Sequence, residues 1–171
     1  MRLIKICFIA VSVTLIAGCL EEVSNVPREK EEALFIIVRN EGNSDEAVDF
    51  YVDSLLVGKT FKDKITEAVV PAGEHTLFFE YDHDHYGTTI DIAPNSVIAV
   101  RQYVLNAYMF HRVAFDSLND DSLNFFLKQN LPVVKYNYYE ATQKVNTWRF
   151  SHILADFEKC PIDIRTVHPR N

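Results

Sequence analysis

The sequence predicts a mainly β protein, a small β-sandwich with an α-containing addition at its C-terminal end. Over residues 48–53, apolar side chains alternate with polar ones, so one face of a strand would be apolar and the other wettable. Residues 76–81 repeat this alternation. Between the two segments, Pro71-Ala72-Gly73 combines a residue that presets φ with one that permits positive φ, which predicts a turn.

Residues 1–18 are typical of an export signal. Arg2 and Lys5 give the start a positive charge, and an apolar run follows over residues 6–16. This run is short for a membrane span, and small residues follow it. We therefore expect a secretory signal that is removed, rather than a transmembrane helix.

Ile16-Ala17-Gly18-Cys19 resembles the lipobox of bacterial lipoproteins, in which an apolar residue and two small ones precede a cysteine. The resemblance implies diacylglyceryl transfer to the Cys19 thiol, cleavage after Gly18 and acylation of the new amino group. Several acyl chains together make a stable anchor. Leu20 stands where an aspartate would retain the protein, which implies sorting to the outer membrane. The alternative is an ordinary secretory signal with a chance cysteine.

The remainder of the chain is acidic and long enough for one domain with a sizeable core. The whole sequence has 17 basic and 24 acidic residues, a formal net charge of −7 and no basic run. Nucleic acid is therefore a disfavoured partner, and we expect contact with the membrane through lipidated Cys19. Because Cys7 leaves with the signal and Cys19 is consumed by the lipid, Cys160 is the remaining thiol, which excludes a disulfide within the chain.

Residues 19–32 are polar and acidic, and we expect them to form a tether. The sandwich is expected over residues 33–115. It opens with an apolar run at residues 33–38, which is typical of a strand buried on both faces. Residues 40–45 form a turn cluster. A hairpin is expected after this cluster, with strands at residues 47–53 and 55–59.

Three more segments complete the sheet pattern. Residues 88–92 alternate between apolar and polar side chains, and residues 97–104 continue the pattern. A turn is expected at Asn106-Ala107, and residues 108–115 would form one more strand after it.

Residues 116–171 predict a C-terminal α/β addition packed on the sandwich. Asp120 or Asp121 would cap a short helix, and residues 133–139 alternate weakly as a strand would. A second helix is predicted from apolar residues at the spacing i, i+3, i+4 and i+7. Its buried stripe would consist of Phe150, Ile153, Leu154 and Phe157.

Part of the sandwich resembles a known family. The residues that carry the resemblance are Phe50-Tyr51-Val52-Asp53, Val57-Gly58, Pro71-Ala72-Gly73-Glu74-His75-Thr76-Leu77 and Ile98-Ala99-Val100. They are similar to PEGA-like domains of bacterial lipoproteins, whose function is unknown and whose pattern is V-Y-V-D-G … P-P-G-x-H-x-L. The resemblance covers about residues 33–105 and implies an immunoglobulin-like or prealbumin-like β-sandwich. Ser54 stands where the family has a turn glycine.

Asp82-His83-Asp84-His85 is the sharpest candidate site. In a continuous strand His83 and His85 would share one face, and two imidazoles beside a carboxylate can hold zinc or copper. A third ligand would come from His75 or His111. The alternative is a solvated hairpin tip. We favour the tip, because two histidines without a defined third ligand are a weak metal signal, and we expect no metal and no cofactor.

Catalytic patterns are missing from the sequence. Cys160 has no histidine placed beside it by a motif, although His168 is close in the chain, so a small buried thiol is the favoured interpretation. The sequence has no G-x-S-x-G, no G-x-G-x-x-G and no Walker motif. We therefore expect a protein that is not an enzyme.

Tyrosines gather in the second half of the chain: Tyr103, Tyr108, Tyr136, Tyr138 and Tyr139. Tyrosine is enriched at interfaces because it joins apolar area to a hydrogen-bonding tip. The favoured alternative is that these residues cover the seam between the sandwich and the C-terminal helix.

Together these patterns predict a cell-envelope lipoprotein that faces the periplasm and is held at the membrane by Cys19. It would act as a non-catalytic interaction or structural module with an envelope protein as partner. The alternative is a periplasmic metal-binding protein that uses residues 82–85.

Overall fold

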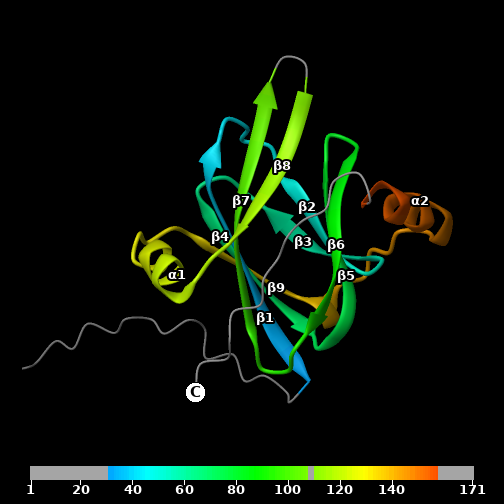
Figure 1. Ribbon diagram of the computed structural model, residues 1–171, viewed down its shortest axis with the longest axis horizontal. Coiled ribbons are helices and arrows are strands. Elements are labelled where there is room, and N and C mark those ends of the chain that lie inside the picture. Colours follow the sequence, from blue (N-terminus) through cyan, green and yellow to red (C-terminus); the bar gives the residue numbers. More distant parts are fainter. Residues whose placement is uncertain (1–30, 108–109, 158–171) are drawn as a thin grey trace, which may run out of the picture.

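The computed structural model describes residues 31–107 and 110–157, and these form a two-sheet sandwich with two helices near the C-terminal end (Figure 1). The five-stranded sheet has the order β8-β7-β1-β4-β9, and the four-stranded sheet has the order β3-β2-β5-β6. The mainly β fold is therefore confirmed. The elements are β1 (Glu32–Gly42), β2 (Val48–Val52), β3 (Leu55–Thr60), β4 (Lys64–Pro71), β5 (Gly73–Tyr81), β6 (Asp84–Ile92), β7 (Val97–Ala107), β8 (Phe110–Ser117), α1 (Asp120–Leu127), β9 (Val133–Asn137), a 3₁₀ turn η1 (Tyr138–Glu140) and α2 (Thr147–Phe157).

Strand β1 is the centre of the five-stranded sheet. It pairs with β4 in antiparallel and with β7 in parallel, and residues 33–39 are all buried, as the apolar run predicted. The strand is longer than expected, because a bulge after Val38 lets it continue to Gly42. A Cβ atom at Gly42 would collide with the carbonyl oxygen of Val104, so only glycine fits there. The predicted turn at residues 40–45 therefore begins too early.

An aromatic stack crosses the core between the two sheets. The ring centroids of Phe35 in β1 and Phe50 in β2 are 5.3 Å apart. Phe50 lies 5.0 Å from Phe79 in β5, and Phe79 lies 4.4 Å from Phe115 in β8. The stack joins two strands of each sheet. The apolar faces predicted for residues 48–53 and 76–81 are thus confirmed as the interior.

A buried cation closes one end of this core. The Arg39 guanidinium is fully buried and donates hydrogen bonds to the carbonyl oxygens of Ser44, Glu46 and Thr60 at 2.8, 2.6 and 3.2 Å. Burial lowers the pKa of Arg39, but an arginine stays charged in proteins. These bonds fix the loop that follows β1 against the start of the β3–β4 connection.

The two helices cover opposite outer faces of the sandwich, so the layers run helix, sheet, sheet, helix (Figure 1). Helix α1 buries Leu123 and Phe126 against the outer face of the five-stranded sheet. Its N-cap is Asn119, whose side-chain oxygen accepts from the Ser122 N–H at 2.9 Å. Neither Asp120 nor Asp121 is the cap, because both already lie inside the helix.

Helix α2 covers the outer face of the four-stranded sheet. Tyr51 and Phe78 stack there at 4.3 Å, and Ile153 packs in the same cluster. Tyr51 is only 4 % exposed, so the prediction that this face is wettable was wrong at Tyr51. The predicted stripe holds for Ile153 and the half-buried Phe150 but not for Leu154, which is 39 % exposed, and the side chain of Phe157 lies outside the description.

The β7–β8 hairpin and strand β9 complete the large sheet. Asn106 pairs with His111, and Ala107 pairs with Phe110, so the turn predicted at Asn106-Ala107 lies within the ladder instead. The expected boundary between residues 115 and 116 falls inside β8. Strand β9, predicted as residues 133–139, ends at Asn137 and pairs in parallel with β4.

Several predicted features lie outside the described residues. They are the signal at 1–18, Cys19, the tether up to residue 30, Tyr108, Cys160 and His168. In the part of the chain that the structure describes, no helix is both long enough and apolar enough to cross a membrane.

Candidate functional site

The segment 82–85 is a hairpin turn rather than a continuous strand. Asp82 and His83 form the turn with φ values of 49° and 70°, and Tyr81 pairs with Asp84 across it. Two residues with positive φ are typical of the type I′ turn that joins antiparallel strands. His83 therefore lies in the exposed turn and His85 in β6. The premise that both histidines share one strand face was wrong.

His85 belongs to a polar cluster beneath α2. Its ring centroid lies 6.4 Å from that of Phe78, and its Nε2 lies 4.0 Å from Oε2 of Glu80. The Glu80 carboxylate also accepts from the Tyr51 hydroxyl at 3.2 Å and pairs with Arg149 of α2. Burial, with the Glu80 carboxylate adding to it, raises the pKa of Tyr51. This cluster fixes α2 to the sheet.

His75 has a structural position as well. Its Nδ1 lies 2.9 Å from Oδ2 of Asp53, and its Nε2 lies 3.3 Å from the Ala72 carbonyl oxygen. The second Asp53 oxygen accepts from the Thr76 N–H at 3.1 Å. The Asp53 and His75 side chains thus join the β2–β3 turn to the start of β5.

The described histidines do not come together as a metal site. His75 lies near the start of β5, His83 in the turn between β5 and β6, and His85 in β6, and the side chain of His111 is outside the description. Over residues 31–107 and 110–157, no group of three or more His, Cys, Asp or Glu side chains could hold a metal ion.

The tyrosines of the β9 region divide into two kinds. Tyr136 and Tyr138 pack against the core between the sheets, and burial raises the pKa of Tyr138. The Tyr136 ring lies so close to Gly58 of β3 that a Cβ atom there would collide with it. Tyr139 is 58 % exposed. Tyr136 and Tyr138 therefore cover the core between the two sheets rather than the predicted seam with the C-terminal helix, and Tyr139 is exposed.

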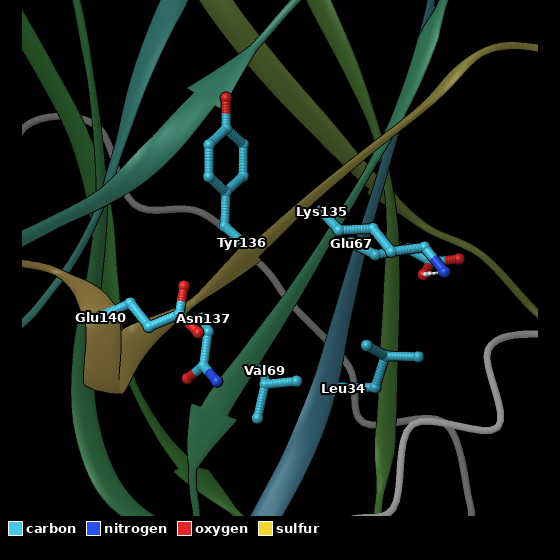
Figure 2. A pocket seen from close by; sticks show the side chains of 7 residues that line it. All are labelled: Leu34, Glu67, Val69, Lys135, Tyr136, Asn137 and Glu140. Atoms are coloured by element: carbon cyan, nitrogen blue, oxygen red, sulfur yellow. Dashed lines mark ion pairs between the residues drawn. The ribbon is translucent and has the colours of Figure 1, made fainter.

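A small cavity lies on the outer face of the five-stranded sheet, beside the last strand β9. Its volume is about 200 Å³. Figure 2 shows the side chains around it, with the Tyr136 ring pointing away from the others. The lining residues come from β1, β4, β9 and η1, and they are Leu34, Glu67, Val69, Lys135, Tyr136, Asn137 and Glu140.

Glu67 gives this cavity its charge. The residue is only 5 % exposed, and its Oε2 atom accepts no hydrogen bond from any described residue. The Lys135 Nζ atom lies 3.6 Å from it, which is an ion pair but too long for a good hydrogen bond. The two residues are direct cross-strand neighbours in the β4–β9 register. A buried carboxylate with an unfilled acceptor is costly unless something else pairs with it.

Sequence reasoning did not find this cavity. Its one signal is an acidic residue, Glu67, inside the strand-like run from Ile65 to Val70. Glu67 indicates a site only once β9 is known to pair with β4. This pairing brings Lys135 next to Glu67 and Asn137 next to Val69.

Comparison with family models, with curated proteins and with solved structures finds no match for this chain. The resemblance to PEGA-like domains therefore stays a prediction.

Proposed function

We propose that this chain is a lipid-anchored envelope lipoprotein that works as a non-catalytic binding module facing the periplasm from the outer membrane. The observation that carries the proposal is the order of the N-terminal residues. A positive start, an apolar run, Ala17-Gly18 and Cys19 follow one another as in a lipobox. The partner is a protein of the envelope, and the fold presents sheet edges and loops to it.

The metal-binding alternative has less support from the geometry. His83 lies in the turn between β5 and β6 and His85 lies in β6, and the two ring nitrogens of His75 face Asp53 and the Ala72 carbonyl oxygen. Calorimetry with zinc tests this ranking. A submicromolar affinity that disappears in the His83→Ala/His85→Ala variant would place metal binding first.

Cys19→Ala should abolish membrane anchoring. Without the thiol, the diacylglyceryl group has no attachment point, so the variant should be released or should accumulate as an uncleaved precursor. Metabolic labelling with a palmitate analogue and membrane fractionation measure both effects.

The matched controls are Cys7→Ala and Cys160→Ala, since the sequence has three cysteines. Both controls should label and fractionate as the wild type does. If Cys19→Ala still incorporates the analogue and stays in the membrane fraction, the anchor assignment is wrong.

A further inference from the structure

The cavity beside β9 contains a buried anion whose present partner can be replaced. Oε2 of Glu67 is held by Lys135 alone among the described residues, at 3.6 Å and without a hydrogen bond. Lys135 has a side chain that is 59 % exposed, whereas that of Glu67 is 7 % exposed. An exposed lysine gains little from such a pair, because it can be solvated equally well by water. The carboxylate cannot leave, but the ammonium can.

The cavity is sized for a single side chain. At about 200 Å³ it is smaller than the pockets of about 300–1,000 Å³ that hold drug-sized ligands. Leu34 and Val69 form an apolar wall against which the aliphatic part of a side chain could pack. Glu67 lies at one side of the cavity and can accept a hydrogen bond. Asn137 and Glu140 add further polar groups from β9 and η1 (Figure 2). A side chain with an aliphatic stem and a cationic end fits both the apolar wall and the Glu67 carboxylate.

A partner polypeptide can reach this cavity from the side of the sheet. Within the described residues, β9 is the last strand of the sheet and pairs on one side only. The strand is five residues long, and Val133 at its start is exposed. Strand edges of this kind are places where extended segments of other chains dock.

We propose that the cavity formed by Leu34, Glu67, Val69 and Asn137 binds an arginine side chain of a partner polypeptide, with Lys135 displaced into solvent. A guanidinium suits the site better than an ammonium, because its planar fork can donate two hydrogen bonds to one carboxylate and it is more weakly hydrated. The acidic balance of the chain favours the approach of a basic segment. This inference rests on the proposed binding function and names the chemistry of the partner.

The test is a titration of the detergent-solubilised full chain, followed by two-dimensional NMR. The probe is the blocked tripeptide acetyl-Ala-Arg-Ala-amide, and the neutral comparison is acetyl-Ala-norleucine-Ala-amide. The arginine peptide should shift the signals of residues around Glu67 and bind at least tenfold more tightly than the norleucine peptide. Equal affinities, or shifts located elsewhere, would overturn the proposal.

Two variants with opposite effects make the test specific. Glu67→Gln should weaken binding at least tenfold. Lys135→Met should strengthen it severalfold, because the internal cation no longer competes. Asp49→Asn is the control, since Asp49 has its own lysine partner, Lys59, at 2.8 Å on the other sheet, and it should leave the affinity unchanged. A Lys135→Met variant that weakens binding contradicts the proposal even if Glu67→Gln is unstable.

One further probe separates a polypeptide from a small cation. If n-butylguanidinium binds as tightly as the arginine tripeptide, the site takes a free small molecule and the partner assignment is wrong. None of these measurements depends on lipidation. A failure here therefore leaves the membrane anchor untouched, and a failure of the Cys19→Ala test leaves this site untouched.

Discussion

Tyr136 is the residue through which the edge of the large sheet is joined to the small sheet. Its ring lies directly on Gly58, where no side chain larger than hydrogen fits, and it packs against the core between the sheets. Its neighbour Tyr139 is exposed. Two tyrosines three residues apart therefore have opposite roles.

Tyr136→Ser should lower the free energy of unfolding by about 2–4 kcal/mol, because it removes a large, partly buried ring that packs on the core and leaves a gap there. Tyr139→Ser should change it by no more than about 0.5 kcal/mol. Urea denaturation of both variants measures the difference. If both variants lose the same free energy of unfolding, the packing of the Tyr136 ring on Gly58 does not stabilise the fold more than the exposed Tyr139 ring does.

Tyr51 makes stability depend on pH in the alkaline range. Its pKa is raised from the ordinary value of 10.0 by burial and by Glu80, so the folded state holds the phenol proton longer than the unfolded state does. The stabilisation is complete below pH 10 and is lost as the pH rises above it. Wild-type stability should therefore fall above pH 10 more steeply than that of Tyr51→Phe.

Chemical denaturation at pH 8 and at pH 11 measures this effect. At pH 8, Tyr51→Phe should be less stable by about 0.5–1.5 kcal/mol, because the hydrogen bond to Glu80 is lost. At pH 11 the gap should narrow. Tyr139→Phe serves as the exposed control and should follow the wild type at both pH values. A gap that widens with pH would contradict the assignment.

At the scale of elements, α2 is fixed by apolar contacts and by a charged one. Ile153 is buried against Tyr51 and Phe78, and Arg149 pairs with Glu80 of β5. Leu154, the next residue after Ile153, is 39 % exposed. The helix therefore buries a narrower stripe than its apolar spacing suggests.

Ile153→Ala should destabilise the protein by about 2–4 kcal/mol, whereas Leu154→Ala should cost less than about 1 kcal/mol. Thermal unfolding by calorimetry compares the two. If Leu154→Ala has the larger effect, α2 lies on the sheet with a different face.

Local periodicity predicted which segments form strands and helices better than it predicted which residues other elements bury. Short-range patterns predict the β2–β3 hairpin, the buried part of β1 at residues 33–38 and the spacing of Phe150 and Ile153. They do not predict the burial of Tyr51, because the helix that covers it lies about a hundred residues further along the chain. Turns also escaped prediction where shape depends on a contact elsewhere, as at Gly42 beside Val104.

At the scale of the whole molecule, the two helices act as covers for both outer faces of the sandwich. Without α1, the side chains of Leu34, Ile36 and Ile65 would lose their cover on the large sheet. Without α2, Tyr51 and Phe78 would lose theirs on the small sheet. Helices α1 and α2 therefore cover apolar side chains of the sandwich.

A chain truncated after Ser117 should aggregate or melt at a clearly lower temperature than the full chain, because large apolar faces are rarely exposed on soluble monomers. Calorimetry and size-exclusion chromatography measure both properties. A truncated sandwich that stays monomeric and equally stable would show that the C-terminal part folds independently.

The candidate site could not be predicted from the sequence, because it depends on which strands lie side by side. Glu67 and Lys135 meet only through the parallel pairing of β4 with β9. The pattern of alternate residues gives each strand its faces but does not name its neighbour. The segment 82–85, in contrast, is local, and the sequence analysis could consider both a strand and a hairpin tip for it.

The central position of β1 has a consequence for how the chain reaches its folded state. Leu34 pairs on one side with Val69 and on the other with Val97. Both partner strands of β1 therefore come much later in the chain. Non-local pairing of this kind slows folding. Until β7 is available, residues 34–38 remain an uncharged, proline-free run of the type that forms cross-β aggregates. If the chain is exported unfolded, as the proposed function requires, residues 34–38 have to be shielded until β7 is available.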